Sequence, residues 1–340
     1  MALLEVRDLW VTFPTRHGPL HALRGVDLTL AAGERLGIVG ESGAGKSMAA
    51  FAILNLIAEP GHIAHGEVWF EGRDLTRLPR SALRRIRGNR ISMIFQDPMM
   101  TLNPVLSVAT QMVETLKAHR GISEREARRL AIDKLGEVQI PAPERRIDAY
   151  PHELSGGLRQ RVVIAIALLT EPAIIVADEP TTALDVTVQA EIMALMRQLC
   201  REHGVGLILI THDLAVVAQV TQRILVMYAG KVIEAGPTAG IIAEARHPYT
   251  RGLIAALPQR NRPGRRLNQI PGSMPSLDAI PAGCAFHPRC DFATAPCRRE
   301  IPGLRPLAAG HHAACRRAED IRAALADAAA AGAAAAKERA

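Results

Sequence analysis

The sequence predicts an α/β protein built on a mostly parallel β-sheet. Two apolar segments of strand length, 173–177 and 205–210, enclose a segment with helical periodicity, 188–200. Strand, helix and strand in this order indicate parallel strands joined by a right-handed crossover. A third apolar segment, 35–39, leads directly into a glycine-rich loop. Aromatic residues make up only 3% of the chain, so the core must be aliphatic, as suits buried parallel strands.

The other elements follow from the spacing of apolar residues. The expected strands are 3–9, 25–30, 66–70 and 91–95, and the expected helices are 47–57, 108–118 and 124–138. The last two helices fall between residues 97 and 170, which we therefore interpret as a helical insertion in the α/β frame.

Residues 40–47, Gly-Glu-Ser-Gly-Ala-Gly-Lys-Ser, fit the phosphate-loop pattern at every fixed position, after an expected strand and before an expected helix. The backbone N–H groups of such a loop and the positive end of the following helix bind phosphate. We expect Lys46 to reach the β- and γ-phosphates and the Ser47 hydroxyl to ligate Mg²⁺. The expected ATP-binding residues of this loop are Gly40, Ser42, Gly43, Gly45, Lys46 and Ser47.

A second catalytic element is an apolar strand that ends in two carboxylates, Asp178 and Glu179. The strand should place both acids at the sheet edge beside the phosphate loop. We expect Asp178 to hold Mg²⁺ through water and Glu179 to accept the proton of the attacking water, or to polarise it. Two acids after a strand are common, but a phosphate loop about 130 residues earlier makes this assignment specific.

Residues 154–160, Leu-Ser-Gly-Gly-Leu-Arg-Gln, resemble the signature of the ABC transporter ATPases. In that family the segment opens a helix and binds the γ-phosphate of ATP held by a second subunit. A Ser hydroxyl, Gly N–H groups and a helix N-terminus suit this task. The resemblance implies a head-to-tail dimer with ATP at its interface, contacted in trans by Ser155, Gly156 and Gly157.

Further marks of that family occur in order. Gln96 resembles the Q-loop residue that contacts Mg²⁺ and reports to the membrane subunit. Asp185 ends a segment that resembles the D-loop, which crosses the dimer interface, and His212 resembles the switch histidine that contacts the γ-phosphate. The resemblance thus implies catalytic roles for Glu179, His212 and Gln96, and Mg²⁺ ligation through Ser47, Gln96 and Asp178. An aromatic side chain that stacks on adenine is also implied, and both Phe13 and His17 are candidates.

The resemblance covers residues 1 to about 245 and implies a P-loop NTPase (RecA-like) core with an antiparallel β-subdomain and a helical subdomain near 97–170. Beyond residue 245 Pro is frequent and periodicity fades. Between Arg246 and Arg317 there are 12 Arg residues against 3 acids. We expect a nucleotide-binding domain over 1–245, a C-terminal region over 246–322 and a disordered Ala-rich tail over 323–340.

Several segments resemble the dipeptide/oligopeptide importer branch of the family. They are 95–98, 102–104, 247–253, 270–272, the block of cysteines after residue 283, and Leu158 in the signature. In that branch an extracytoplasmic protein captures the solute, two permease subunits form the channel, and two identical or related ATPases power it. Because the solute is selected outside this chain, nickel, glutathione and other small solutes stay open as alternatives to peptides.

Four cysteines lie close together in the C-terminal region, at positions 284, 290, 297 and 315, whereas Cys200 stands alone and is expected in the core. A cytosolic chain rarely keeps disulfides, so Cys284, Cys290, Cys297 and Cys315 indicate a metal site. Their spacing differs from common zinc motifs, and four thiolates suit a 4Fe–4S cluster, which the resemblance also favours. Zinc, with His287 or His311 replacing a cysteine, and no metal are the alternatives.

Charge and hydropathy limit which partners and which cellular location we expect for this chain. A net charge of +7 is compatible with nucleic acid, but the basic C-terminal region lacks interleaved aromatics, so no nucleic acid is expected as a partner. No uninterrupted apolar run reaches 18 residues, and the first nine residues carry three charges, which excludes a signal peptide. We expect a soluble subunit at the cytoplasmic face of the inner membrane, peripheral to its partners.

Overall fold

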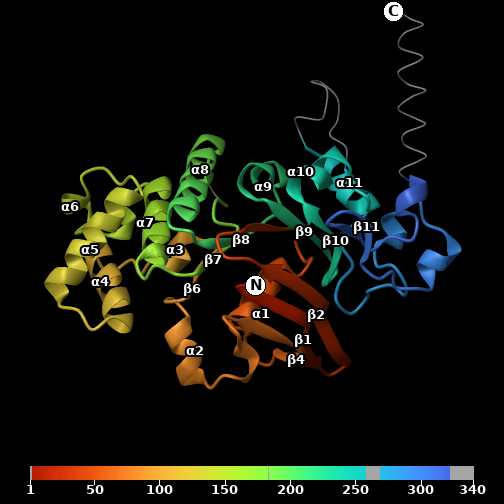
Figure 1. Ribbon diagram of the computed structural model, residues 1–340, viewed down its shortest axis with the longest axis horizontal. Helices are drawn as coiled ribbons and strands as arrows, with labels where there is room; N and C mark the ends of the chain where they lie inside the picture. The colour runs from red at the N-terminus through yellow and green to blue at the C-terminus, as the bar shows by residue number, and fades with distance from the viewer. Residues whose placement is uncertain (1, 183, 258–268, 322–340) are drawn as a thin grey trace, which may run out of the picture.

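The computed structural model describes residues 2–182, 184–257 and 269–321 (Figure 1). The predicted tail, 323–340, lies outside these residues. The main sheet has the strand order β11-β12-β10-β9-β3-β8-β7-β6. Its strands are β3 (Arg35–Val39), β6 (Ile91–Ile94), β7 (Ile174–Asp178), β8 (Gly206–Thr211), β9 (Arg223–Tyr228), β10 (Lys231–Pro237), β11 (Arg305–Ala308) and β12 (His311–Ala313).

The predicted parallel sheet is present as the run β9-β3-β8-β7-β6, in which every neighbouring pair is parallel. All residues of β7 and β8 are buried, which explains why both read as continuous apolar runs. Alternate side chains serve opposite faces of the sheet. Ile175 and Ala177 pack into one hydrophobic core and Ile174 and Val176 into the other, as the two-residue period of a strand requires.

A separate antiparallel sheet has the order β2-β1-β4-β5 and confirms the expected β-subdomain. Its strands are β1 (Leu4–Thr15), β2 (Gly18–Leu30), β4 (His62–Phe70) and β5 (Arg73–Asp74). β1 and β2 form one long hairpin, so the expected strands 3–9 and 25–30 were too short. Register shifts between Val6 and Thr12 interrupt the alternation of apolar and polar residues, and this hid the continuation of the strands.

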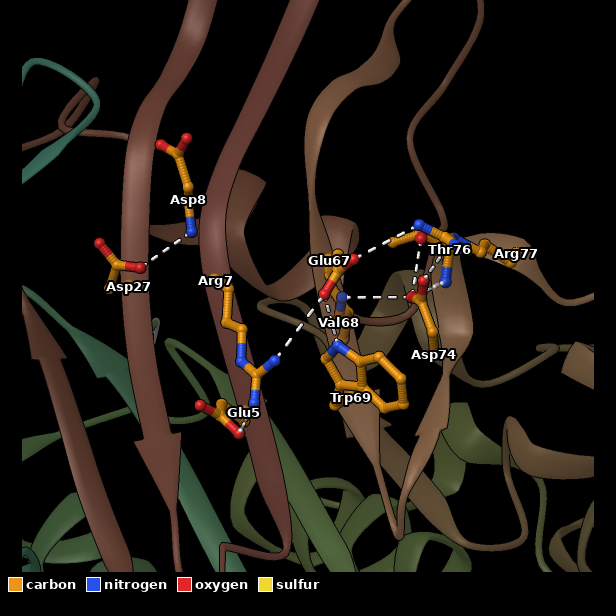
Figure 2. Close-up of polar contacts among 10 residues, drawn as sticks. All are labelled: Glu5, Arg7, Asp8, Asp27, Glu67, Val68, Trp69, Asp74, Thr76 and Arg77. Atoms are coloured by element: carbon orange, nitrogen blue, oxygen red, sulfur yellow. Dashed lines mark hydrogen bonds and ion pairs between the residues drawn. The ribbon is translucent and has the colours of Figure 1, made fainter.

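Charged side chains join the strands of this sheet (Figure 2). Glu67 on β4 accepts a 2.7 Å hydrogen bond from the Trp69 indole, and the guanidinium of Arg7 on β1 lies 3.9 Å from the same carboxylate. Asp74 accepts hydrogen bonds from the backbone and hydroxyl of Thr76, at 3.0 and 2.7 Å, and thereby caps the 3₁₀ turn η1 (Leu75–Arg77). These contacts fix the end of the β4–β5 hairpin.

The helical insertion is confirmed and lies at the opposite end of the long axis from the C-terminal region (Figure 1). Its helices are α3 (Pro98–Thr101), α4 (Val108–His119), α5 (Glu124–Glu137), α6 (Pro143–Arg146) and α7 (Gly156–Leu168). Ser107 and Ser123 cap α4 and α5 by accepting hydrogen bonds from backbone N–H groups three residues later. Met112 on α4 and Ala131 on α5 are fully buried where these helices pack together.

The remaining helices include those that follow the parallel strands. They are α1 (Lys46–Ile53), α2 (Arg80–Ile86), α8 (Val186–Glu202), α9 (Leu214–Val220), α10 (Thr238–Ala243) and α11 (Pro248–Ala255). α1 ends four residues before the predicted end at residue 57, because Asn55 takes a left-handed conformation with φ of 51°. Cys200 is buried in α8, as expected of a core residue.

The C-terminal region adds two strands to the main sheet, because β12 pairs antiparallel with β10 and β11 pairs with β12. Both strands are short, and β11 contains Arg and Pro while β12 contains two His, so apolar periodicity does not reveal them. The fully buried carboxylate of Glu234 on β10 joins the two parts. It accepts hydrogen bonds from the backbone N–H groups of Arg246 and His247, at 2.6 and 3.0 Å, and lies 2.7 Å from the His311 imidazole.

Candidate nucleotide-binding site

Four loops with predicted functional residues leave the same edge of the parallel sheet. Val39 at the end of β3 pairs with Thr211 on β8, Asp178 on β7 pairs with Ile210, and Ile94 on β6 pairs with Ala177. The residues that follow these strands therefore meet at one edge, where open α/β sheets bind ligands.

The phosphate loop connects β3 to α1 and needs glycine at two close approaches. A Cβ at Gly40 would lie 2.4 Å from the carbonyl oxygen of Met227, and one at Gly45, with φ of 102°, would lie 3.1 Å from that of Ala22. Lys46 begins α1, and its ammonium donates to the carbonyls of Gly40 and Glu41 at 2.9 and 3.0 Å. The loop thus curls around its own lysine.

Ser47 and Asp178 meet at the base of this loop. The Ser47 hydroxyl donates a 3.0 Å hydrogen bond to Asp178 Oδ1. Burial raises the pKa of Asp178, although the bond from Ser47 works against this shift. Burial also lowers the pKa of Lys46, and the nearby carboxylates, above all that of Glu179, oppose it. The oxygens of Ser47 and Asp178 are the type of ligand that Mg²⁺ prefers, and the buried Lys46 ammonium beside them is suited to bind phosphate.

The carboxylate of Glu179 is the meeting point of the other predicted residues. His212 Nδ1 lies 3.2 Å from Oε1, Gln96 Nε2 donates to Oε2 at 3.4 Å, and Lys46 Nζ lies 4.0 Å from Oε1. The Thr182 hydroxyl also donates to Oε2, at 3.1 Å. A partly exposed carboxylate among these groups is suited to accept a proton from a water molecule next to phosphate.

Comparison with known proteins agrees with this geometry. Residues 23–182 match the ABC transporter family, and residues 233–297 match the oligopeptide/dipeptide transporter C-terminal region. A peptide import ATP-binding protein of Brucella melitensis biotype 1 is 44% identical over 331 residues, covering 94% of this chain and 98% of the relative. The oligopeptide transport ATP-binding protein OppD of Salmonella typhimurium is 48% identical over 313 residues, covering 92% and 93%.

The chain belongs to the ABC transporter ATPases, in the dipeptide/oligopeptide importer branch.

Solved structures of ABC ATPases share the fold. A dimeric post-hydrolysis state of the ATP-binding cassette MJ0796, bound to ADP and Pi, has a TM-score of 0.62 and 32% identity, covering 69% of this chain and 98% of that one. CbiO1 from Clostridium perfringens, part of the CbiONQ transporter complex, has a TM-score of 0.61 and 29% identity, covering 72% and 91%. These solved structures confirm the P-loop ATPase fold. The activity of this ABC ATPase is ATP hydrolysis that is coupled to transport.

The signature segment of this ABC ATPase begins α7. Ser155 is the N-cap, and its hydroxyl accepts a 3.4 Å hydrogen bond from the backbone of Leu158. A Cβ at Gly157 would lie 2.9 Å from Val188 Cγ1, so this glycine allows α7 to pack closely against α8. Asp185 in turn caps α8, accepting from the backbone of Val188 at 3.0 Å. The predicted trans contacts are thus located at the N-termini of two adjoining helices.

The two candidates for adenine stacking lie in different surroundings. Phe13 on β1 is half-buried and packs closely against Gly61, whose Cβ would approach the ring to within 2.4 Å. His17 is exposed in the turn between β1 and β2, where its backbone N–H donates to the Thr15 hydroxyl. Both residues stay predictions.

The predicted metal-binding character of the C-terminal region is not supported by the structure. Within residues 2–182, 184–257 and 269–321, no group of three or more His, Cys, Asp or Glu side chains is arranged to hold a metal ion. The four cysteines, Cys284, Cys290, Cys297 and Cys315, do border one small cavity. Burial raises the pKa of Cys290 and of Cys315 to about 11, whereas the pKa of Cys297 is lowered, because hydrogen bonds from Thr294 and the charges of Arg317 and Arg316 outweigh its burial.

Three residues at the site were not predicted. Thr182 reaches Glu179, as described above, and Glu41 lies inside the phosphate loop at a position that the motif leaves variable. Arg289 contacts Glu41 from the C-terminal region, 248 positions away in the sequence. Thr182 stands in the segment that resembles the D-loop, so its position was a usable signal. No pattern in the sequence connects Arg289 with the loop.

Proposed function

We propose that this chain powers the uptake of di- or oligopeptides as the ATPase subunit of an ABC importer. The C-terminal match over residues 233–297 carries the choice of solute class, and the names of the relatives from Brucella melitensis and Salmonella typhimurium support it. Nickel and glutathione importers are less favoured because these relatives are named for peptides. A non-transport ABC ATPase that acts on nucleic acid is the other alternative, and it is not favoured because the basic C-terminal region lacks interleaved aromatics.

In this proposal the groups around Glu179 carry out hydrolysis. Lys46 and the N–H groups of residues 40–47 would bind the phosphates, and Ser47 and Asp178, with Gln96, would hold Mg²⁺, whose charge would offset that of the phosphates. Glu179 accepts a proton from the attacking water, and His212 contacts the γ-phosphate. The observation that supports these roles is the convergence of all these side chains on one carboxylate and one loop.

Two ATPase chains complete each other's sites in the proposed cycle. Ser155, Gly156, Gly157 and Asp185 of one chain contact the nucleotide bound to the phosphate loop of the other. The dimeric state named for the cassette MJ0796 supports this arrangement. The second chain is identical or a related ATPase.

The proposed partners are two permease subunits and an extracytoplasmic peptide-binding protein, with this chain at the cytoplasmic face of the membrane. The helices of the described residues include none that is long and apolar enough to span a bilayer. The helical insertion and the loop at Gln96 are the proposed contacts with the permeases.

A second proposal concerns the cavity that the four cysteines border. Four cysteines on one cavity match the ligand number of a 4Fe–4S cluster, and we propose that they hold one with a structural role. Anaerobically purified protein should then contain iron and acid-labile sulfide in the ratio of this cluster. Cys290→Ser should lose the iron and Cys200→Ser should keep it. Colourless protein with stoichiometric zinc, or without metal, would exclude the cluster.

The transport function is tested with purified importer in vesicles, loaded with the peptide-binding protein and labelled peptide. ATP-dependent peptide uptake is expected, and the same vesicles carrying Glu179→Gln should take up peptide at background rate. Uptake of nickel or glutathione in place of peptide would overturn the solute class while leaving the ATPase role intact.

A further inference from the structure

We propose that Arg289 is a positioning residue for nucleotide binding, which neutralises Glu41 inside the phosphate loop and holds the start of that loop. The C-terminal region would thereby set the affinity of this chain for ATP. This inference rests on the nucleotide-binding role proposed above for residues 40–47.

The contact between Arg289 and Glu41 is a bidentate ion pair. Arg289 Nη1 donates to Glu41 Oε2 at 2.6 Å, and Nη2 donates to Oε1 at 2.9 Å. The Arg289 side chain is only 6% exposed and that of Glu41 is 30% exposed. Paired, charge-assisted hydrogen bonds of this geometry are among the strongest in proteins, and partial burial limits their screening by salt.

The same guanidinium also holds a second segment against the loop. Arg289 Nε donates to the carbonyl of Pro271 at 2.8 Å, and Nη2 lies 3.4 Å from that of Gly272. Two residues further along, Met274 is the nearest neighbour of Gly43, whose Cβ would lie 3.8 Å from Met274 Cγ. One side chain therefore fastens both the loop and the segment that packs on it.

The backbone of Glu41 is fixed as well. Its N–H donates a 2.7 Å hydrogen bond to the Tyr249 hydroxyl, and its carbonyl accepts from Lys46 Nζ at 3.0 Å. Tyr249 is fully buried, with ring centroids of Tyr228 and Phe286 at 4.8 and 5.4 Å. The position of Lys46 is thus linked through the backbone of a single residue, Glu41, to a buried aromatic cluster of the C-terminal half.

Charge explains why this link matters for ATP. The loop has to attract a polyphosphate, yet Glu41 places a carboxylate within it, and like charges at short range repel. The two hydrogen bonds that the Arg289 guanidinium donates to the Glu41 carboxylate set a positive charge directly against the negative one. Without Arg289 the carboxylate of Glu41 would be free to face the bound phosphates, and the loop would lose its fastening.

A double-mutant cycle on the full-length chain tests this. The fluorescence of methylanthraniloyl-ATP gives the dissociation constant, and the ATPase of the assembled importer gives KM and kcat. Arg289→Ala should weaken ATP binding about tenfold, within the usual range of coupling between linked sites, and should raise KM more than it lowers kcat. Arg289→Lys, which keeps the charge, should recover part of the loss.

The decisive comparison is between the effect of Arg289→Ala in the wild-type chain and its effect in a chain that carries Glu41→Gln. In a Glu41→Gln chain, Arg289→Ala should change the dissociation constant less than twofold, because no carboxylate is left to neutralise. An equal loss in both backgrounds would show that Arg289 acts only on the fold and would overturn the proposal.

Arg305→Ala is the matched control, because Arg305 forms a bidentate ion pair with Glu319 in the C-terminal region. Arg305 Nη1 donates to Glu319 Oε1 at 2.7 Å, and this pair does not involve the phosphate loop. It should leave ATP affinity unchanged. An equal loss in Arg305→Ala and Arg289→Ala would also reject the inference. Lys46→Ala distinguishes a failure of the proposed nucleotide site from a failure of the role given to Arg289. If Lys46→Ala keeps full ATP affinity, the nucleotide site itself is misassigned, whatever Arg289→Ala does.

Discussion

The Ser47 hydroxyl lies 3.0 Å from the carboxylate of Asp178, although 131 positions separate the two residues in the chain. Ser47 is the second residue of α1 and Asp178 is the last residue of β7. The parallel order β3-β8-β7 brings the ends of these elements to one edge, so the relationship results from sheet topology. It is the geometric basis for placing nucleotide and Mg²⁺ at this edge.

Glu179→Gln should bind ATP and hardly hydrolyse it. An amide has nearly the same shape as the carboxylate but cannot accept a proton, so we expect the ATPase rate to fall by about 10²–10³. Steady-state ATPase and light scattering of the ATP-loaded chain, which should detect a trapped dimer, check this. Glu202→Gln, on the exposed side of α8, serves as control and should retain activity. A Glu179→Gln protein with near-normal turnover would remove Glu179 from the mechanism.

Lys46→Ala should weaken ATP binding by about 10- to 100-fold, the equivalent of about 1.5–3 kcal/mol for a hydrogen bond to a charged group. The buried ammonium is held by two carbonyls of its own loop, so it is placed before the nucleotide arrives. Titration calorimetry with ATP measures the change, and Lys117→Ala, at an exposed position of α4, is the control. Unchanged affinity would show that the loop binds phosphate without its lysine.

Ser155→Ala should abolish ATPase activity of the assembled importer while leaving ATP binding by the single chain intact. Ser123→Ala is a matched control, because Ser123 caps α5 as Ser155 caps α7, with similar backbone angles and the same i to i+3 bond. Both changes should cost about 1 kcal/mol of folding stability. If the two variants lose equal ATPase activity, Ser155 acts only as a helix cap.

The stability of the chain should fall as the pH is lowered from about 6.5 to about 4. Burial lowers the pKa of His247 to about 4, against the opposing charge of Glu234, whereas an unfolded histidine has a pKa of about 6.5. Between these pH values the His247 side chain binds a proton in the unfolded chain but not in the folded chain. Up to about 3 kcal/mol of the free energy of unfolding present at neutral pH is therefore lost.

His247→Asn should flatten that pH dependence, since asparagine can still accept the hydrogen bond from the backbone of Tyr249 that caps α11 but does not titrate. Urea unfolding between pH 4 and pH 7 measures the difference, with the exposed His62→Asn as control. Identical pH profiles for wild type and His247→Asn would contradict the assignment.

Much of the fold and the site could be predicted because the responsible signals are local. The phosphate loop, the apolar strand before Asp178 and Glu179, and the apolar spacing of α4 and α5 each depend on residues within a few positions of one another. Fully buried strands such as β7 and β8 read as apolar runs because both faces of the sheet are covered. The family resemblance then gave order to these separate motifs.

Other features required contacts between distant segments. The pairing of β12 with β10 depends on a few backbone hydrogen bonds and on the buried carboxylate of Glu234, neither of which leaves a periodic pattern. The spacing of cysteines predicted a metal site, but spacing does not fix how thiols are oriented around a cavity.

The sequence by itself determined the chemistry of this protein: a loop for phosphate, acids after a strand, and a signature that implies a second subunit. Only the tertiary structure decided that Arg289 neutralises Glu41 and that Tyr249 holds the same loop. The physical reason is that a motif encodes the backbone shape of a few adjoining residues, whereas an ion pair across 248 positions exists only once packing has brought both partners together.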